Sequence, residues 1–455
     1  MTDSDSIPDD LPPRQRIPAI VAVLLCIVTA SVNVTLVNLA LPVMAKDFNV
    51  DAEHVIYVVS SYQLTLVLSL LVLSNLGDLL GFKRVFLTGA VVFVVASFGC
   101  AVSQSLPMLI SFRIIQGLGA TAIQGTFFSL LTLIYPKQQL GRGMGLCSMT
   151  FALATLSGPP LAALILAVGS WHWLFIFNIP FGIVSLILGW HYFPANAVTV
   201  TKCPINVSDA TLHIFTFGLF FFATSGWSHQ PQQCVGNTVL TVLCLVSAFI
   251  YILRQRGQKA PFFPIDLLRQ GSFGFPIILT ILSFTALLTT VVAVPFIFHS
   301  RFGYSASQTG LLMTALAGAT VVSSMVAGYS IERTKPIYIS GIGFMIFALS
   351  AFSFALLPEN VTVFDLIWRL GLFGIGGGLI QPANNFMAVS SAPAERKGAA
   401  NGILSTSIMF GQTLGMVLLT VIFLLTGSEA MFSPFYISGI IATMGAVVVC
   451  TRLRY

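Results

Sequence analysis

The chain has 455 residues, of which 56% are hydrophobic and only 8% are charged, and its mean hydropathy is +0.93. Soluble domains carry roughly a quarter of their residues as charged side chains, so this composition excludes a soluble protein and predicts a polytopic membrane protein. The seven cysteines have no metal-ligand spacing, and the acidic start MTDSDSIPDD disfavours a cleaved signal peptide.

Fourteen apolar segments are long enough to cross a bilayer, for which about 20 residues are needed. Their approximate ranges are 17–43, 54–77, 84–103, 106–133, 143–168, 171–193, 209–228, 237–253, 273–298, 306–331, 337–357, 363–388, 399–426 and 430–451. The sequence therefore predicts an all-α membrane protein with fourteen transmembrane helices in a 6+2+6 arrangement. The expected domains are a cytoplasmic tail (1–16), an N-terminal six-helix bundle (17–195), two inserted helices with linkers (196–272) and a C-terminal six-helix bundle (273–452).

The positive charges predict the orientation. With the N-terminus in the cytoplasm, 17 of the 21 Lys and Arg residues fall in cytoplasmic segments and only Lys46 and Arg301 fall in outer loops. This bias places both termini in the cytoplasm. It also accounts for the net charge of +6 without a nucleic-acid partner. The short loops are typical of a multi-pass protein of the bacterial inner membrane.

One stretch of the chain is repeated 257 residues later. The repeat joins an apolar, glycine-rich helix, a short charged loop and a second apolar helix, which indicates a duplicated helix bundle. The matched pairs are Gly117 with Gly374, Gly119 with Gly376, Gln124 with Gln381, Pro136 with Pro393, Gly141 with Gly398, Gly145 with Gly402, Ser148 with Ser405 and Gly158 with Gly415.

Several motifs resemble those of the major facilitator superfamily. The loop SNLGDLLGFKR at positions 74–84 is similar to its G-x-L-A-D-R-x-G-R-K loop, with Ser74 in place of the first glycine. Arg113-x-x-Gln116-Gly117-x-Gly119 resembles its fourth-helix motif, and Gly158-Pro159 resembles its antiporter motif, although Ala162 and Ala163 replace the final glycines. VNLALP at 37–42 and WHWLFIFNIPFG at 171–182 are similar to segments of the fourteen-helix drug:proton antiporters.

That resemblance implies a secondary transporter that works by alternating access around a central site, with a small-molecule substrate and the bilayer as its partners. An exporter of amphipathic drugs or metabolites is the leading expectation, and a monomer without a cofactor or metal is expected. The resemblance also assigns a gating loop in which Asp78 holds one state of the transport cycle. The residues of this loop are Asp78, Gly81, Lys83 and Arg84. A casual surface ion pair between Asp78 and its basic neighbours is the alternative.

Arg113 is the strongest candidate for a substrate-binding residue. It lies about seven residues inside a predicted helix, where a charge costs about 2.5–3.5 kcal/mol and calls for an aqueous cavity or a partner. Helical spacing places it on one face with Gln116 and Gln124. A structural Arg bonded to helix-end carbonyls is the alternative. Relatives have an acidic residue on the first helix within reach of this Arg, and alignment on VNLALP puts Asn33 there. An Asn cannot carry a proton.

Further candidates lie in the twelfth predicted helix. Arg369 is a second intramembrane cation, but Arg113 aligns with Leu370, so the two arginines are not strictly symmetric, and Arg369 could equally extend to lipid headgroups. Gln381, Asn384 and Asn385 form a polar cluster for substrate contact or gating, with bonding between helices as the alternative.

No Asp or Glu lies deep in any predicted helix, so proton coupling, the default of the family, receives the least support from the residues themselves. Two membrane arginines instead favour a second hypothesis, the transport of an anionic solute such as a carboxylate metabolite or siderophore. An enzyme is not expected, because HExxH, GxSxG, paired membrane aspartates and a P-loop are all absent from the sequence. A channel and a non-transporting sensor remain as alternatives.

Overall fold

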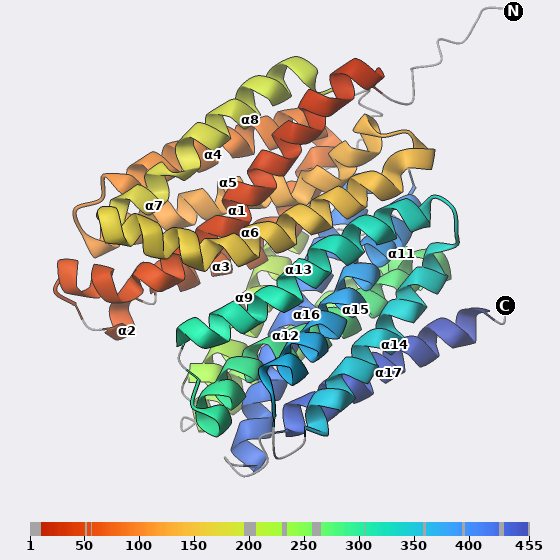
Figure 1. Cartoon of the computed structure of the whole chain (residues 1–455). Coiled ribbons are helices and arrows are strands. Elements are labelled where there is room, and N and C mark those ends of the chain that lie inside the picture. The colour runs from red at the N-terminus through yellow and green to blue at the C-terminus, as the bar shows by residue number, and fades with distance from the viewer. Residues whose placement is uncertain are drawn as a thin grey trace, which may run out of the picture. The chain divides into compact units, whose positions relative to one another are not determined.

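The computed structural model describes residues 11–50, 52–55, 57–194, 206–229, 234–256, 265–304, 306–357, 361–393, 396–426 and 432–453. Within these ranges every regular element is a helix, in agreement with the predicted all-α class. Figure 1 shows the helices in chain order. Their bounds are α1 Pro13–Asp47, α2 Ala52–Val55, α3 Tyr57–Leu80, α4 Phe82–Ala101, α5 Leu106–Ile134, η1 Lys137–Gln139, α6 Leu140–Val168, α7 His172–Ile176, α8 Asn178–Tyr192, α9 Val207–His229, α10 Cys234–Arg256, α11 Ile265–Arg269, α12 Gly271–Phe302, α13 Ala306–Ile331, α14 Pro336–Ala355, α15 Val363–Ser390, α16 Lys397–Thr426 and α17 Ser433–Leu453.

Twelve of the fourteen apolar segments predicted from the sequence each coincide with one helix. The segment 171–193 covers the pair α7 and α8, which is interrupted at Phe177, and the segment 54–77 begins in α2 and continues in α3. Twelve helices in the described ranges are long and apolar enough to cross a membrane. These twelve do not include α6, and α9 contributes only the shorter apolar stretch Ser208–Ala223. A multi-pass membrane protein is thus supported, whereas the count of fourteen spans and the 6+2+6 arrangement stay predictions. Residue 56 of the segment 54–77 and the first two residues of the segment 430–451 lie outside the described ranges.

The boundaries of the helices follow from local chemistry. Gly81 separates α3 from α4 with a φ of 96°, a backbone conformation that side chains with a Cβ rarely adopt. Thr362 begins α15 with a capping box, in which its hydroxyl accepts from the amide of Asp365 and the carboxylate of Asp365 accepts from the amide of Thr362.

The chain forms two compact units, each described here by itself. Unit 1 comprises Met1–Gly143, Ala154–Pro204 and Pro393–Gly402, and unit 2 comprises Met144–Leu153, Ile205–Ala392 and Ile403–Tyr455. In unit 1, α5 packs against α3, α4 and α1, while α8 packs against α1 and α4. The inner core of this unit includes Trp171 and Phe175, both fully buried.

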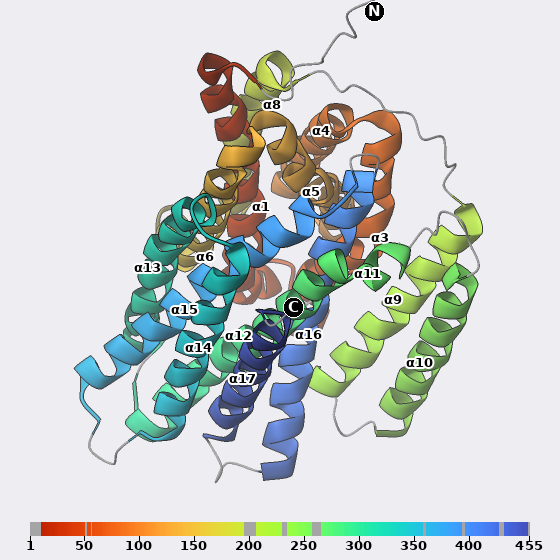
Figure 2. The same cartoon turned by 90° about the vertical axis from the view of Figure 1, so that its right-hand side faces the viewer.

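Unit 2 repeats this pattern of packing. Helix α15 packs against α13, α14 and α12, while α17 packs against α12 and α14. The helices α9 and α10 also belong to unit 2 and run along each other, as Figure 2 shows. Thr216 of α9 and Ser247 of α10 are hydrogen bonded at 2.6 Å, so this helix pair has a polar contact in its seam.

The duplication extends to the closest helix contacts. A Cβ on Gly119 would lie 2.7 Å from the carbonyl oxygen of Gly89 in α4, and a Cβ on Gly376 would lie 2.9 Å from the equivalent oxygen of Gly343 in α14. The glycine on α5 therefore recurs 257 residues later, as predicted, whereas the glycine on α4 recurs after 254. The connection 356–362 is three residues longer than its counterpart 102–105, which accounts for the difference.

Candidate functional site

The interior of unit 1 contains a buried cation held by polar and aromatic groups. Arg113 of α5 is fully buried. Its Nε donates to the carbonyl oxygen of Val58 in α3 at 3.0 Å, and its Nη1 donates to Oε1 of Gln116 at 2.6 Å. The guanidinium is thus bonded to a neighbouring helix and to the next turn of its own helix, and neither bond involves an anionic partner.

Two aromatic rings complete the surroundings of this guanidinium. Its central carbon lies 4.2 Å from the centre of the Tyr62 ring and 5.8 Å from that of Phe175. The negative face of an aromatic ring attracts a cation, most strongly where water is excluded. Because Tyr62 comes from α3 and Phe175 from α7, the charge of Arg113 ties three helices of unit 1 together.

A chain of neutral polar side chains extends from Gln116. Its Nε2 donates to Oγ of Ser97 in α4 at 2.7 Å. Its Oε1 also accepts from Nδ2 of Asn33 in α1 at 3.4 Å, and Oδ1 of Asn33 accepts from Nδ2 of Asn178 in α8 at 3.3 Å. All four residues are fully buried. The structure thus brings together three predicted site residues, Asn33, Arg113 and Gln116.

The network leaves specific polar atoms without a partner in the described part of the chain. These atoms are Nη2 of Arg113 and Oδ1 of Asn178. A buried donor without an acceptor costs roughly 1–3 kcal/mol, and more when it carries charge. Among the described residues no carboxylate pairs with Arg113. Among the described residues of unit 1, the network therefore has unused hydrogen-bonding capacity, and no carboxylate compensates the charge of Arg113.

Sequence reasoning missed three members of this network. Asn178 lies inside the motif WHWLFIFNIPFG, where an amide among apolar residues is a signal that could have identified it. Tyr62 and Ser97 carry no such signal, because a tyrosine or serine in an apolar helix is common.

The remaining polar candidates lie apart from this network. Gln124 is half-buried on α5, two turns beyond Gln116. Gln381, Asn384 and Asn385 lie on α15 in unit 2. Oδ1 of Asn384 accepts from Ser340 of α14 at 2.7 Å, whereas its Nδ2 has no partner among the described residues.

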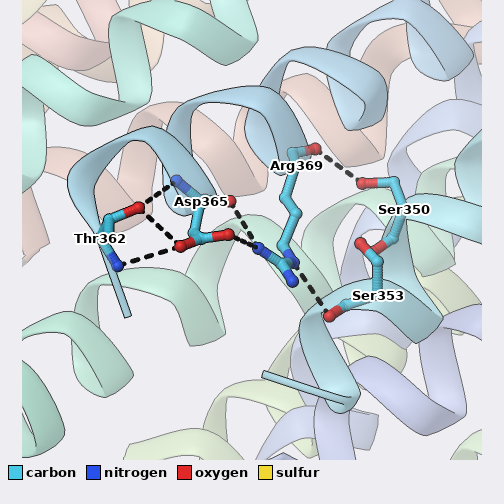
Figure 3. A network of polar contacts seen from close by, with 5 residues as sticks. All are labelled: Ser350, Ser353, Thr362, Asp365 and Arg369. Carbon is cyan, nitrogen blue, oxygen red and sulfur yellow. Dashed lines mark hydrogen bonds and ion pairs between the residues drawn. The ribbon is translucent and has the colours of Figure 1, made fainter. Parts of the chain in front are cut away.

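Arg369 has a different environment from Arg113, as Figure 3 shows. Its Nη1 bonds to the carboxylate of Asp365 at 3.1 Å and to the carbonyl oxygen of the same residue at 2.9 Å, and its Nε donates to the carbonyl oxygen of Ser353 at 3.1 Å. Ser350 donates to the carbonyl oxygen of Arg369 at 2.7 Å. This cation is neutralised one turn away on its own helix, an arrangement that fits a structural role.

The predicted gating loop separates into two sets of contacts. Asp78 accepts from the backbone amides of Gly398 and Ala399, at 2.7 and 2.9 Å, in the first turn of α16. Lys83 donates to the carbonyl oxygens of Trp190 and Phe193 at the C-terminal end of α8, both at 2.9 Å. Asp78 therefore caps a helix N-terminus and Lys83 a helix C-terminus, each with the favourable sign of charge.

The structure also shows the positions of Arg84 and of the antiporter-type motif. Arg84 is exposed at the start of α4. Gly158 and Pro159, the antiporter-type motif, lie within α6, and Gly158 is buried. Among the described residues no cluster of His, Cys, Asp or Glu could hold a metal ion.

Comparison with known proteins identifies the relatives of this chain. The family model described as Major Facilitator Superfamily matches residues 23–300 and residues 277–454. The uncharacterized transporter YebQ of Escherichia coli (strain K12) is 37% identical over 98% of this chain and 97% of its own length. The multidrug resistance protein Stp of Mycobacterium tuberculosis (strain CDC 1551 / Oshkosh) is 25% identical over 89% of this chain and 75% of its own length. The solved human organic anion transporter MFSD10 (TETRAN) has a TM-score of 0.68 at 14% identity, covering 96% of this chain and 100% of its own. That structural likeness establishes the fold alone.

Proposed function

The chain belongs to the major facilitator superfamily, and from this premise we propose that it is a secondary active transporter that exports amphipathic drugs or metabolites by alternating access. Its fine classification in the fourteen-helix drug:proton antiporter family is part of the same proposal. The motifs at 74–84, 113–119 and 158–159 support it, as does the similarity to the multidrug resistance protein Stp. The expected setting is the inner membrane, with both termini in the cytoplasm and a monomeric protein.

The observation that carries this proposal is the buried network around Arg113. Amphipathic ligands bind to apolar and aromatic surfaces that include a few polar groups. Tyr62 and Phe175 supply aromatic faces, while Gln116, Asn33 and Asn178 supply neutral donors and acceptors. In a transporter, such a network deep in a membrane-spanning bundle lies where substrate is bound between the two access states. Gln124 is proposed to extend this polar lining within unit 1, and Gln381, Asn384 and Asn385 are proposed to contact substrate or to take part in gating within unit 2.

Asp78 is proposed to gate this cycle. Its carboxylate bonds to two amides of α16, and a helix N-terminus carries a partial positive charge that favours an anion. A state with these bonds is favoured over one without them. The contacts of Lys83 with α8 support a role in fixing the end of the loop.

A second candidate function is the transport of an anionic solute without proton antiport. The uncompensated charge of Arg113 favours it, because Nη2 has no acceptor and the aligned position on α1 holds Asn33 instead of an acid. A carboxylate is the natural partner of a guanidinium, which offers it paired donors. A carboxylate metabolite or siderophore would supply this group.

A binding screen on the purified protein in detergent tests both candidates. Thermal unfolding would be followed with tetraphenylphosphonium as a lipophilic cation and with citrate as a polycarboxylate anion. A ligand at a hundredfold excess over its Kd adds about 2.7 kcal/mol of stability. The variant Arg113→Gln would be compared with Arg84→Gln, which removes an exposed charge.

Stabilisation by the cation in both variants supports the drug exporter. Stabilisation by the anion that is lost in Arg113→Gln and kept in Arg84→Gln supports the anion transporter. Transport in proteoliposomes, with and without a pH gradient, then decides the coupling: flux that ignores the gradient argues against proton antiport. A protein that binds ligands of either class and shows no flux would refute both transport proposals.

A further inference from the structure

The first turn of α16 is held within unit 1 by more than the carboxylate of Asp78. Residues 397–402 belong to this unit, whereas the rest of α16 belongs to unit 2. Besides the two amide bonds to Asp78, Lys397 donates through Nζ to the hydroxyl of Thr132 in α5 at 3.1 Å. The start of α16 thus contacts both α3 and α5.

Two neutral side chains add a second set of bonds. Nδ2 of Asn401 donates to the carbonyl oxygen of Gly125 in α5, and it also lies 3.4 Å from the carbonyl oxygen of Gln124. Oγ of Ser74 in α3 lies within hydrogen-bonding distance of the carbonyl oxygens of both Gly125, at 2.8 Å, and Gly398. A hydroxyl has one proton, so Ser74 donates to one of these oxygens at a time.

The backbone at this point leaves no room for larger residues. A Cβ on Gly398 would lie 2.7 Å from the carboxyl carbon of Asp78, and a Cβ on Gly402 would lie 2.8 Å from the side chain of Leu71. Ser74 and Asn401 are both buried. The hydrogen bonds of Asn401 and Ser74 are therefore shielded from water. Water cannot replace either bond when it is lost.

The duplicated half of the chain lacks these two groups. The offset of 257 aligns Asn401 with Met144, and the offset of 254 aligns Ser74 with Gly328. A Cβ on Gly145, which aligns with Gly402, would lie 2.9 Å from Cα of Gly328, so the close packing of small residues recurs within unit 2. The amide and the hydroxyl occur in one copy only.

We propose that Ser74 and Asn401 form a neutral latch that favours the state in which the first turn of α16 is bound to α3 and α5. The latch acts beside Asp78 and does not depend on charge. Both are positioning residues, since they bond to backbone carbonyls of other helices. The inference rests on the proposed alternating access, in which the two duplicated bundles move relative to each other. Because only one half carries the latch, it biases the two access states unequally.

The test measures the ratio of states in the protein without substrate. Spin labels would replace the exposed residues Gln138 and Thr334, in the full chain with its native cysteines removed, and the distance between them would be measured by pulsed electron resonance. The variants are Asn401→Ala, Asn401→Leu, which keeps a similar shape and loses the donor without adding a charge, and Ser74→Gly. The control is Ser69→Ala, because Ser69 on the same helix bonds to Thr121 of α5 and not to α16.

Each latch variant should raise the ratio of the minor to the major state about five-fold, the effect of one hydrogen bond of ordinary strength. The rise should be the same at 0.1 and 1 M salt, and Ser69→Ala should leave the ratio unchanged. Hydrogen exchange at the amides of 397–402 should rise in parallel. Unchanged ratios and unchanged exchange in the folded variants would overturn the latch.

A failure of the latch proposal can be distinguished from a failure of the proposed transport function. The ratio is measured without any ligand, so a shift in Asn401→Leu supports the latch even if no tested compound is transported. Conversely, substrate flux with an unaltered ratio in all three variants would leave the transporter proposal standing and refute the latch.

Discussion

The guanidinium of Arg113 lies against the ring face of Tyr62, with its central carbon 4.2 Å from the ring centre. This contact joins α5 to α3 at a point where both side chains are fully buried. In the described part of the chain, ring faces and neutral oxygens take the place that a carboxylate fills in an ion pair. The arrangement accommodates a permanent charge and leaves Nη2 of Arg113 without a hydrogen-bond partner among the described residues.

Tyr62 should stabilise the fold more through its ring than through its hydroxyl. Tyr62→Leu removes the aromatic face and should cost up to about 2 kcal/mol, the range of a desolvated cation–π contact. Tyr62→Phe keeps the face and removes only a neutral hydroxyl, so it should cost less, about 1 kcal/mol at most. Thermal unfolding in detergent measures both. Equal losses in the two variants would contradict this assignment.

Arg113→Lys should not preserve the network. A single ammonium cannot bond in two directions while lying flat on Tyr62, so the bonds to Val58 and Gln116 cannot both remain. Loss of one hydrogen bond from a charged group costs about 1.5–3 kcal/mol. Chemical unfolding would show this loss of stability. An unchanged unfolding midpoint would show that a single ammonium group stabilises the network as well as the guanidinium does.

Asn33→Asp should compensate the charge of Arg113. Asn33 and Arg113 both donate to Oε1 of Gln116, so a carboxylate at position 33 lies next to the guanidinium. If the protein binds anions, their affinity should fall at least ten-fold, because the new carboxylate competes for the same cation. Titration calorimetry at pH 7.5 tests this statement, with Asn49→Asp at an exposed position as the matched control.

Gly376 should be far less tolerant of a methyl group than its neighbour Gly377. A Cβ on Gly376 would lie 2.8 Å from the backbone nitrogen of Phe347, whereas a Cβ on Gly377 meets nothing within 4 Å. Gly376→Ala should therefore force α14 and α15 apart and lower the yield of folded protein. Gly377→Ala should be neutral or stabilising, since Ala favours helix. Size-exclusion profiles and thermal midpoints would rank them, and the reverse order would disprove the contact.

Thr362→Ala should lower stability without changing ligand binding. Thr362 caps α15 and orients Asp365, which in turn neutralises Arg369. Loss of such a cap costs about 1 kcal/mol. If Arg369 is structural, the affinity for any ligand found in the screen should stay within two-fold of the parent. A larger change in affinity would indicate that Arg369 takes part in substrate binding.

The sequence by itself was enough to predict where the helices lie and that the two halves of the chain are duplicated. Apolar runs of about 20 residues can only be stable in lipid as helices, because every backbone polar group must be satisfied internally. The glycines of α5 and α15 identified the duplication, since close helix contacts require small residues at fixed spacing. Arg113 was recognisable because a charge inside an apolar helix needs a partner.

Which partner each group takes was decided only by the tertiary structure. Arg113 and Arg369 look alike in the sequence, yet the first contacts Tyr62 and Val58 on another helix and the second pairs with Asp365 on its own. The rotation of α3 about its axis sets which of its residues faces α5, and this rotation depends on packing that helical periodicity does not encode. The same holds for Ser74 and Asn401, which are 327 residues apart in sequence and bond to the same carbonyl group of Gly125.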